Sequence, residues 1–485
     1  MAHVDTRDQP PPDTRFHATR GILLTQVLRL MVRVVTAACL ARLISPAYYG
    51  VYGMAALVYG LAYVVQDFGL ASVTLRKAAI GGDERTALFW LNAGTGALLA
   101  VIVAALGPAA AAFYGEPLLR QLLPALAVTF VINGLYAQLR AQLARERRFG
   151  ELNRIEIAAF VLSSGVALLA ARLGAGCWAL ATLPLTAEVV IAVGVWRAQA
   201  WRPGRWPAGF SPRTSLALGA AISGHEVLRY LQRSTDQFFI GRWFGPSPLG
   251  LYGRSAQLVL LPGQYLTDPL AAWVISSLGQ SHDAPGAARA FWCRVVNGLA
   301  HLTLPLAVVL FCLPWEVLRI AFGSDWTPGA AMLRGISISL LAQPVLAAET
   351  WLLIATGHSR RLLAWSAVTL VLVIAACLVA RPAGPAVLGG AISGVLLLAA
   401  FAGAVFVLRG LPAGPRDLAA AMARPLLISL LAVAAVLGAL TLVPASGSLV
   451  RVILGTGITV GCWAAACATP GVRGELTEHF LRSRP

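Results

Sequence analysis

Long apolar runs constrain this sequence more than any other feature. Segments such as LFWLNAGTGALLAVIVAALG (88–107) and LLISLLAVAAVLGALTLV (426–443) have the length at which an α-helix crosses a bilayer. Their residues do not alternate between apolar and polar, as the strands of a transmembrane barrel do. Only 12% of the 485 residues are charged and 58% are hydrophobic, whereas soluble domains carry about 25% charged residues. The sequence therefore predicts an all-α, polytopic membrane protein.

We predict 14 membrane spans, joined by short connections that contain Gly and Pro. Their approximate ranges are 20–42, 47–75, 86–107, 118–143, 154–172, 177–196, 214–241, 249–277, 292–314, 329–356, 361–380, 386–408, 420–443 and 449–469. No segment between them is long enough to form a soluble domain.

The basic residues give these spans a direction. A net charge of +17 on a soluble protein would suggest nucleic acid, but here the charge lies in short loops, so we expect no nucleic-acid partner. With the N-terminus in the cytoplasm, 24 of the 38 basic residues fall in the cytoplasmic segments, and each of the seven opposite loops holds one. Basic residues prefer cytoplasmic loops. The sequence predicts a multi-pass protein of the bacterial inner membrane with both termini in the cytoplasm.

An internal repeat relates two parts of the chain at an offset of 200 residues. The segment TQVLRLMVRVVTAACLARLISPAYYGVYGMAALV begins at residue 25, and HEVLRYLQRSTDQFFIGRWFGPSPLGLYGRSAQL begins at residue 225. Identical pairs include Val27/Val227, Leu28/Leu228, Arg29/Arg229, Arg33/Arg233, Arg42/Arg242, Pro46/Pro246, Gly50/Gly250, Tyr52/Tyr252 and Gly53/Gly253. Apolar composition alone does not produce shared Arg, Gly, Pro and Tyr.

The repeat predicts the domain organisation. Its two copies begin six spans apart, so both halves enter the membrane in the same direction, as parallel repeats do. We expect two parallel six-helix bundles followed by two additional helices. The predicted parts are a cytoplasmic tail (1–19), an N-terminal bundle (20–209), a C-terminal bundle (210–409), and two further helices with a cytoplasmic tail (410–485).

Charged residues lie on one face of each repeated helix. The first carries Gln26, Arg29, Arg33 and Thr36, and the second carries Glu226, Arg229, Arg233 and Asp236. An Arg at the bilayer centre costs about 2.5–3.5 kcal/mol on insertion scales, so these faces must turn away from lipid. Planar guanidinium groups suit phosphate oxygens. We therefore predict a cationic substrate-binding cleft.

The predicted substrate-binding residues are Arg29, Arg33, Arg229, Arg233 and Gln26. The alternative is that these arginines only pair with acids. Glu226–Arg229 and Arg233–Asp236 have the spacing of i,i+3 ion pairs, and Asp67 or Glu156 could pair with the first helix from a distance.

Intramembrane acids are candidates for coupling transport to a proton or an ion. The principal candidates are Asp67, Glu226, Asp236 and Asp268, and weaker ones include Glu156, Glu188 and Glu349.

Motifs for conventional enzymes are absent from the sequence. The single lysine, Lys77, follows no Gly-rich loop, so no P-loop for ATP is present. No HExxH, CxxC or GxSxG occurs, and the seven Cys have no metal-ligand spacing. The sequence predicts no catalytic residue, no cofactor, no metal site, and a protein that is not an enzyme.

The segments ARLISPAYYGVYGMAALVYGLAYVVQDFGLASVTLRK (41–77), GAGCWAL (174–180) and STDQFFIGRWFGPSPLGLYGRSAQLVLLP (234–262) resemble the bacterial polysaccharide transporter family. This family contains the Wzx-like flippases for O-antigen and exopolysaccharide, within the multidrug/oligosaccharidyl-lipid/polysaccharide exporter (MOP) superfamily. The resemblance extends over about residues 18–410.

The resemblance implies translocation of an undecaprenyl-pyrophosphate-linked oligosaccharide to the periplasmic leaflet by alternating access. The expected partners are this lipid-linked substrate and the bilayer, with a polysaccharide polymerase and assembly proteins as candidates. Three alternatives stay open: a drug or lipid II exporter of the same superfamily, a membrane-embedded polysaccharide polymerase or ligase, and a non-transporting scaffold of the assembly complex.

Overall fold

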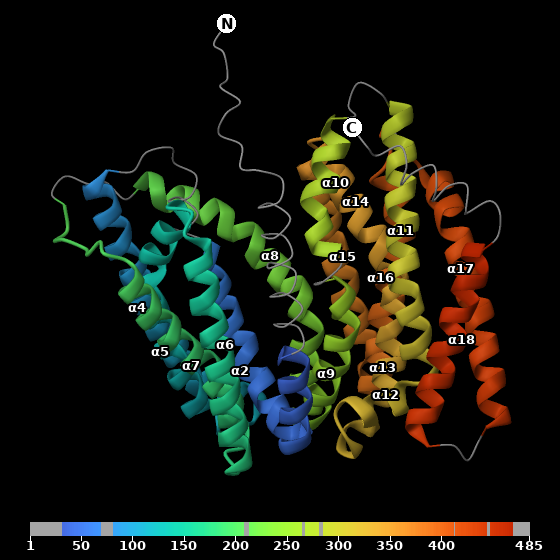
Figure 1. Cartoon of the computed structure of the whole chain (residues 1–485), viewed down its shortest axis with the longest axis horizontal. Coiled ribbons are helices and arrows are strands. Elements are labelled where there is room, and N and C mark those ends of the chain that lie inside the picture. Colours follow the sequence, from blue (N-terminus) through green and yellow to red (C-terminus); the bar gives the residue numbers. More distant parts are fainter. Residues whose placement is uncertain are drawn as a thin grey trace, which may run out of the picture. The chain divides into compact units, whose positions relative to one another are not determined.

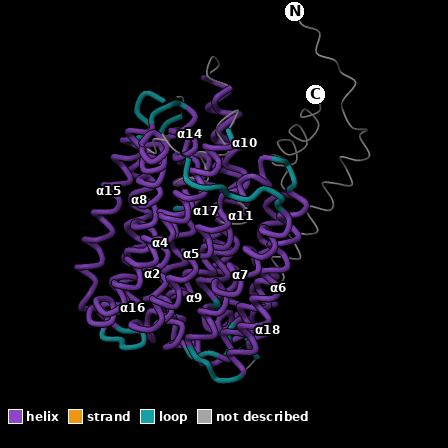
Figure 2. Tube along the Cα trace, turned by 90° about the vertical axis from the view of Figure 1, so that its left-hand side faces the viewer, coloured by secondary structure: helices purple, strands orange, loops and turns teal. Residues whose placement is uncertain are grey.

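The computed structural model describes residues 32–68, 81–207, 213–263, 267–280, 285–411, 413–443 and 447–468. Within these residues every secondary-structure element is a helix, drawn in purple in Figure 2. The prediction of an all-α membrane protein is confirmed.

Residues 32–43 are helical and precede the labelled helices of Figure 1. These are α2 (Pro46–Phe68), α4 (Gly82–Tyr114), α5 (Leu119–Arg145), α6 (Phe149–Arg172), α7 (Cys177–Ala198), α8 (Arg213–Phe244), α9 (Pro246–Pro262), α10 (Asp268–Gln280), α11 (Pro285–Cys312), α12 (Pro314–Ala321), η3 (Ser324–Gly329), α13 (Ala330–Ser337), η4 (Ile338–Leu341), α14 (Gln343–Ala355), α15 (Ser359–Ala380), η5 (Arg381–Ala383), α16 (Pro385–Phe406), α17 (Pro415–Leu442) and α18 (Ser448–Ala468).

The described helices support a polytopic membrane protein. Ten of them are long and apolar enough to span a bilayer, and a pair bent by 40°, Ser324–Leu341 with Gln343–Ala355, raises the number to 11. The long helix α8 is not among them, because it carries the charged residues noted above. Every predicted span contains helix, but the count of 14 stays a prediction.

Contacts divide the chain into two units. The first comprises Met1–Ser45, Tyr59–Ala111 and Pro117–Val227, and the second comprises Pro46–Val58, Ala112–Glu116 and Leu228–Pro485. The domain boundaries drawn from the sequence stay a prediction.

The first unit is built on α4, α5, α6 and α7 (Figure 1). Close approach of α4 to α5 depends on small residues, because a Cβ at Gly96 would lie 2.4 Å from the carbonyl oxygen of Phe130. Gln66 of α2 donates through Nε2 to the same carbonyl oxygen at 2.8 Å. A cluster around Phe89, Tyr136 and Val195 fills one end of these helices.

The second unit has two apolar clusters. The larger cluster joins α10, α11, α14, α16 and α17 around Trp292, whose Nε1 donates to the carbonyl oxygen of Ala348 at 3.0 Å. A smaller cluster packs α11 against α17. An ion pair fixes α18 to the short helix α12, because Nη1 of Arg451 lies 2.6 Å from Oε1 of the buried Glu316.

The repeated glycines meet inside the second unit. A Cβ added to Gly50 would lie 1.7 Å from the carbonyl oxygen of Pro246, and one added to Gly250 would lie 1.9 Å from that of Pro46. The two copies of the repeat therefore pack their second helices against each other by the same contact made twice. Only glycine permits so close an approach of two backbones.

Candidate functional site

The second unit contains a cavity of about 350 Å³. Its walls come mainly from α8, α9, α14, α15 and α16. Most of the lining is apolar, and a few polar side chains enter from α8, α14 and α15. A concave, largely apolar space with a small number of placed polar groups is typical of a ligand site.

Two of the predicted site residues, Arg233 and Asp236, line this cavity from α8. The buried hydroxyl of Tyr252 on α9 donates to Oδ2 of Asp236 at 2.7 Å, and the backbone N–H of Gln237 donates to Oδ1 at 2.7 Å. In the part of the chain that the structure describes, no ion pair joins Arg233 to Asp236. The predicted alternative of an i,i+3 pair is therefore wrong here, and the Arg233 side chain is exposed.

Two glutamines tie the walls of the cavity together. Gln232 of α8 donates through Nε2 to the carbonyl oxygen of Ser366 on α15 at 2.5 Å. Gln343 of α14 donates through Nε2 to the carbonyl oxygen of Val259 on α9 at 3.3 Å. The first bond joins α8 to α15 and the second joins α14 to α9, and all four helices line the same cavity.

An acid and an indole also line the cavity. Glu349 of α14 is 3% exposed, and its Oε1 has no hydrogen-bond partner within the described residues. Nε1 of Trp365 on α15 is likewise buried without a partner there. The cavity therefore contains one exposed cation, Arg233, and two acids. Asp236 has hydrogen-bond donors, whereas Oε1 of Glu349 has none within the described residues.

The other described arginines of the prediction lie elsewhere. Arg229 is exposed on α8 and is not part of the cavity lining. Arg33 lies in the first unit with its guanidinium carbon 5.8 Å from the centre of the Phe160 ring, a cation–π contact. Glu156, a predicted distant partner, pairs with Arg140 at 2.7 Å. That all four arginines serve one cleft stays a prediction.

Five predicted residues cannot be placed in the same way. Arg29 and Gln26 lie outside the described residues. Asp67, Glu226 and Asp268 belong to α2, α8 and α10, but their side chains lie outside the described part.

The sequence does not indicate Tyr252 or Trp365 as site residues, and it gives Glu349 only as a weaker candidate. The signal for Tyr252 was its identity with Tyr52 in the repeat. The signal for Glu349 was a single acid within the apolar run QPVLAAETWLLIA. Nothing in the sequence indicates that Trp365 would lie beside it.

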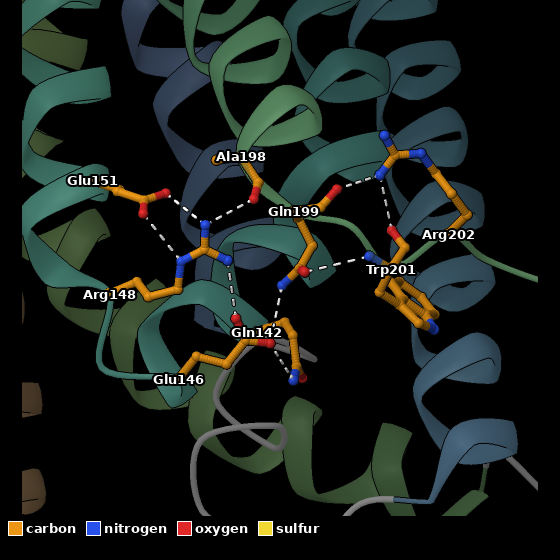
Figure 3. A network of polar contacts seen from close by, with 8 residues as sticks. All are labelled: Gln142, Glu146, Arg148, Glu151, Ala198, Gln199, Trp201 and Arg202. Carbon is orange, nitrogen blue, oxygen red and sulfur yellow. Dashed lines mark hydrogen bonds and ion pairs between the residues drawn. The ribbon is translucent and has the colours of Figure 1, made fainter.

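A second polar cluster lies in the first unit, where α5 passes into α6 and where α7 ends (Figure 3). Arg148 donates to Oε2 of Glu151 at 2.7 Å, to Oε2 of Glu146 at 3.3 Å and to the carbonyl oxygen of Ala198 at 2.9 Å. Gln199 donates through Nε2 to Oε1 of Glu146 at 3.2 Å. The cluster joins two connections on the side that the sequence assigns to the cytoplasm.

Protonation of this cluster follows from its bonds. Partial burial raises the pKa of Glu146, but hydrogen bonds from Gln142, Gln199 and Arg148 outweigh it, so the pKa lies below the usual value. Bonds to Glu151 and Glu146 raise the pKa of Arg148. Glu146 and Arg148 are therefore ionised at neutral pH, and their bonds fix the chain here.

Comparison with known proteins identifies relatives of the sequence. A family described as polysaccharide biosynthesis protein matches residues 39–331. The chain is 22% identical over 312 residues to the lipopolysaccharide biosynthesis protein WzxC of Escherichia coli (strain K12), with 63% of each chain covered. It is 23% identical over 314 residues to the teichuronic acid biosynthesis protein TuaB of Bacillus subtilis (strain 168), covering 64% of this chain and 65% of TuaB.

A third relative is the succinoglycan biosynthesis transport protein ExoT of Rhizobium meliloti (strain 1021), 23% identical over 314 residues, with 64% of this chain and 62% of ExoT covered. The chain thus matches slightly less than two thirds of the length of these curated relatives.

Solved structures share the fold. The lipid II flippase MurJ, in an inward closed conformation, superposes with a TM-score of 0.71 over 92% of this chain and 98% of its own, at 11% identity. An inward-facing multidrug resistance MATE family transporter of the MOP superfamily superposes with a TM-score of 0.56 over 79% of this chain and 94% of its own, at 15% identity. At these identities the similarity shows the MOP-type fold alone.

Proposed function

Because this chain belongs to the polysaccharide biosynthesis protein family, and is Wzx-like within the MOP superfamily, we propose that it is a flippase for lipid-linked oligosaccharide. It carries an undecaprenyl-pyrophosphate-linked oligosaccharide from the cytoplasmic to the periplasmic leaflet of the bacterial inner membrane. The substrate-binding space opens to the two sides in turn, so that the head group crosses while the polyprenyl tail stays in lipid.

The observation that carries this proposal is the cavity in the second unit, with the exposed Arg233 in its wall. A free guanidinium among membrane helices is costly unless water or an anion accompanies it. A diphosphate supplies that anion, and its oxygens fit the planar fork. The amides, the Asp236 carboxylate and the Trp365 ring offer hydrogen bonds and an apolar face to sugar groups.

Arg33, Arg229, Arg29 and Gln26 complete the proposed substrate path. Their position on repeated helix faces is the reason to include them, since the cationic character is shared by both copies. A polysaccharide polymerase and assembly proteins are the proposed partners, because they would consume the translocated oligosaccharide. In this proposal the protein moves its substrate without making or breaking a glycosidic bond.

The experiment compares the two leaflets in a strain from which the gene has been deleted. Lipid-linked oligosaccharide should accumulate intact on the cytoplasmic side, and the restored wild-type gene should release it. Oligosaccharide that crosses normally but stays unpolymerised would contradict flipping and would favour the polymerase or the scaffold.

Arginine variants then test the proposed substrate path. The double variant Arg33→Gln/Arg233→Gln should retain the oligosaccharide in the cytoplasmic leaflet. Arg242→Gln is the matched control, because Arg242 lies on the same helix α8 but stacks on Phe113, with its guanidinium carbon 5.2 Å from the ring centre. Normal export by a well-expressed double variant would contradict the proposed site.

A further inference from the structure

Glu349 stands apart from the other buried acids in the described residues. Three carboxylic side chains are buried there, namely Glu188, Glu316 and Glu349. Glu188 accepts a hydrogen bond from the hydroxyl of Tyr136 at 2.7 Å, and Glu316 pairs with Arg451 at 2.6 Å. Oε1 of Glu349 has neither a donor nor a cation within the described residues.

The surroundings of Glu349 leave space beside its carboxyl group. A Cβ added to Gly403 of α16 would lie 3.1 Å from Oε2 of Glu349 and 2.8 Å from Nε1 of Trp365. Both polar groups therefore border the small space that the absent side chain of Gly403 leaves. Both also line the cavity that contains Arg233.

An isolated carboxylate cannot stay charged at such a place without cost. Transfer of a charge from water into an apolar interior is so unfavourable that the group takes up a proton unless a partner compensates it. Glu188 and Glu316 have such partners, whereas Glu349 lacks one in the described part. The buried, apolar setting of Glu349 therefore favours the neutral acid.

We propose that Glu349 is the proton-carrying site of this transporter, protonated while the cavity is closed around it and ionised when water enters. This inference rests on the proposed transport function. In the forward step, an O–H bond forms at Glu349 as one O–H bond of a hydronium ion breaks, leaving water. The reverse step returns the proton to water.

The proposed ligand is a proton rather than a divalent metal ion. Ca²⁺ and Mg²⁺ need several oxygen ligands at once. Among the described residues no group of three or more His, Cys, Asp and Glu side chains could hold a metal ion. Thr350, next to Glu349, donates its hydroxyl to the carbonyl oxygen of Leu346 at 2.7 Å. A single carboxyl group needs only a proton to become neutral.

Few charged or titratable groups share this cavity with Glu349. Arg233 and Asp236 enter from α8 and Tyr252 enters from α9, whereas α13, α15 and α16 contribute none to the described lining. Asp236 is already bonded to Tyr252. On its other side α14 packs against α10 and α11. There Trp292 bonds to Ala348, and Arg294 of α11 lines a separate pocket with Trp351. Arg233 is thus the one cation in the described lining.

The shared cavity gives the proton a function. With Glu349 neutral, Arg233 is available to a diphosphate. With Glu349 ionised, its carboxylate attracts Arg233 and repels the anionic head group. Proton and anionic substrate therefore bind with positive coupling, and by linkage each strengthens the binding of the other.

Infrared spectroscopy of the full-length protein in lipid tests the protonation directly and needs no transport. The wild type should show the carbonyl band of a protonated carboxyl group near neutral pH. Glu349→Gln should lose this band, while Glu188→Gln, which removes a buried acid that has a hydroxyl donor, should keep it. A wild type without the band overturns the proposal even if no variant folds, and so does a band that survives in Glu349→Gln.

Vesicle transport tests the coupling. The probe is the lipid extract of the deletion strain, reconstituted with purified full-length protein, and the readout is the rate of transfer between leaflets under an imposed pH gradient. A gradient that is acidic on the side where the oligosaccharide starts should accelerate transfer several-fold with the wild type and with Glu188→Gln, and should have no effect with Glu349→Gln. An equal response of Glu349→Gln and the wild type overturns the proposal.

The two measurements separate the two proposals. If the wild type moves no oligosaccharide at all, the proposed function fails, and the infrared band alone still decides the protonation of Glu349. If the wild type transfers oligosaccharide but the band is absent, the proton site fails and the flippase stands.

Discussion

The two copies of the internal repeat share their packing and differ in their chemistry. Gly50 and Gly250 make the same backbone contact, each against the proline that begins the other helix. At the position where the second copy carries Asp236, the first carries Thr36. Only the second copy contributes to the described cavity, through α8 and α9.

This difference separates packing from chemistry in the repeat. The paired glycines, which both copies keep, hold helices together at distances that no side chain allows. Residues that differ create a site in one copy. Asp236 is a carboxylate that accepts a hydrogen bond from Tyr252. The corresponding residue of the first copy, Thr36, has no charge to offer Tyr52. A duplicated scaffold can therefore keep its frame while one half acquires binding and coupling groups.

The largest expected effect comes from the glycines. Gly50→Ala or Gly250→Ala forces a Cβ into a backbone carbonyl group, at 1.7 Å and 1.9 Å, and should cost about 3 kcal/mol or more. Thermal unfolding of the solubilised protein, with expression level, measures the loss. Gly253→Ala is the matched control, because nothing lies within 4 Å of its added Cβ. Equal tolerance at Gly50 and Gly253 would break the comparison.

Single arginine variants sharpen the chemical side of the comparison. Arg233→Gln should reduce export about tenfold or more, since a lost charge-assisted bond is worth about 1.5–3 kcal/mol. Arg33→Gln should reduce it less, because Arg33 packs on Phe160. Surface polysaccharide measured at matched protein levels provides the test. A larger export defect for Arg33→Gln than for Arg233→Gln would show that the arginine of the first copy contributes more to transport.

The tyrosine pair should show a smaller asymmetry. Tyr252→Phe removes the hydroxyl donor of Asp236 and should cost about 1–3 kcal/mol of folding stability. Tyr52→Phe removes no bond to a carboxylate and should cost about 0.5 kcal/mol or less. Thermal unfolding of both variants decides the matter. Indistinguishable melting temperatures would show that the bond to Asp236 contributes nothing to the second copy.

The smallest effect concerns the loops. The α5–α6 connection carries the ion pairs of Arg148, whereas its counterpart six predicted spans on, between α14 and α15, carries a contact of His358 with Thr356 at 3.1 Å. Glu151→Gln should cost about 1 kcal/mol or less, as exposed ion pairs do.

The same cluster should also respond to acid. A folded-state pKa below the unfolded value adds stability that is present at neutral pH and is lost as pH falls through the acidic range. Protease cleavage in this loop should increase at acidic pH in the wild type, and less so in Glu146→Gln. A pH-independent cleavage rate would contradict the assignment.

The helices were predictable because each is a long apolar run between short connections. The run at 426–443, for example, lies within α17 (Pro415–Leu442) apart from its last residue. The bend before α14 was not predictable, since it falls inside a run that hydropathy treats as continuous. Local composition sets where a helix exists, and packing sets where it bends.

The site was predictable in part for a similar reason. Arg233 and Asp236 could be found because charges within an apolar helix stand out. The state of Glu349 could not, because it depends on Gly403 and Trp365, which come from other helices far along the chain. Whether a buried acid has a partner is a property of tertiary structure.

Transfer of lipid-linked oligosaccharide by the purified protein tests the central claim most directly. Vesicles containing the lipid extract of the deletion strain would be assayed with a membrane-impermeant sugar-binding protein that detects only the outer leaflet. The account predicts that the wild-type protein exposes oligosaccharide initially held inside, and that Arg33→Gln/Arg233→Gln slows this while Arg242→Gln does not. A folded wild-type protein that leaves the two leaflets unchanged would contradict it.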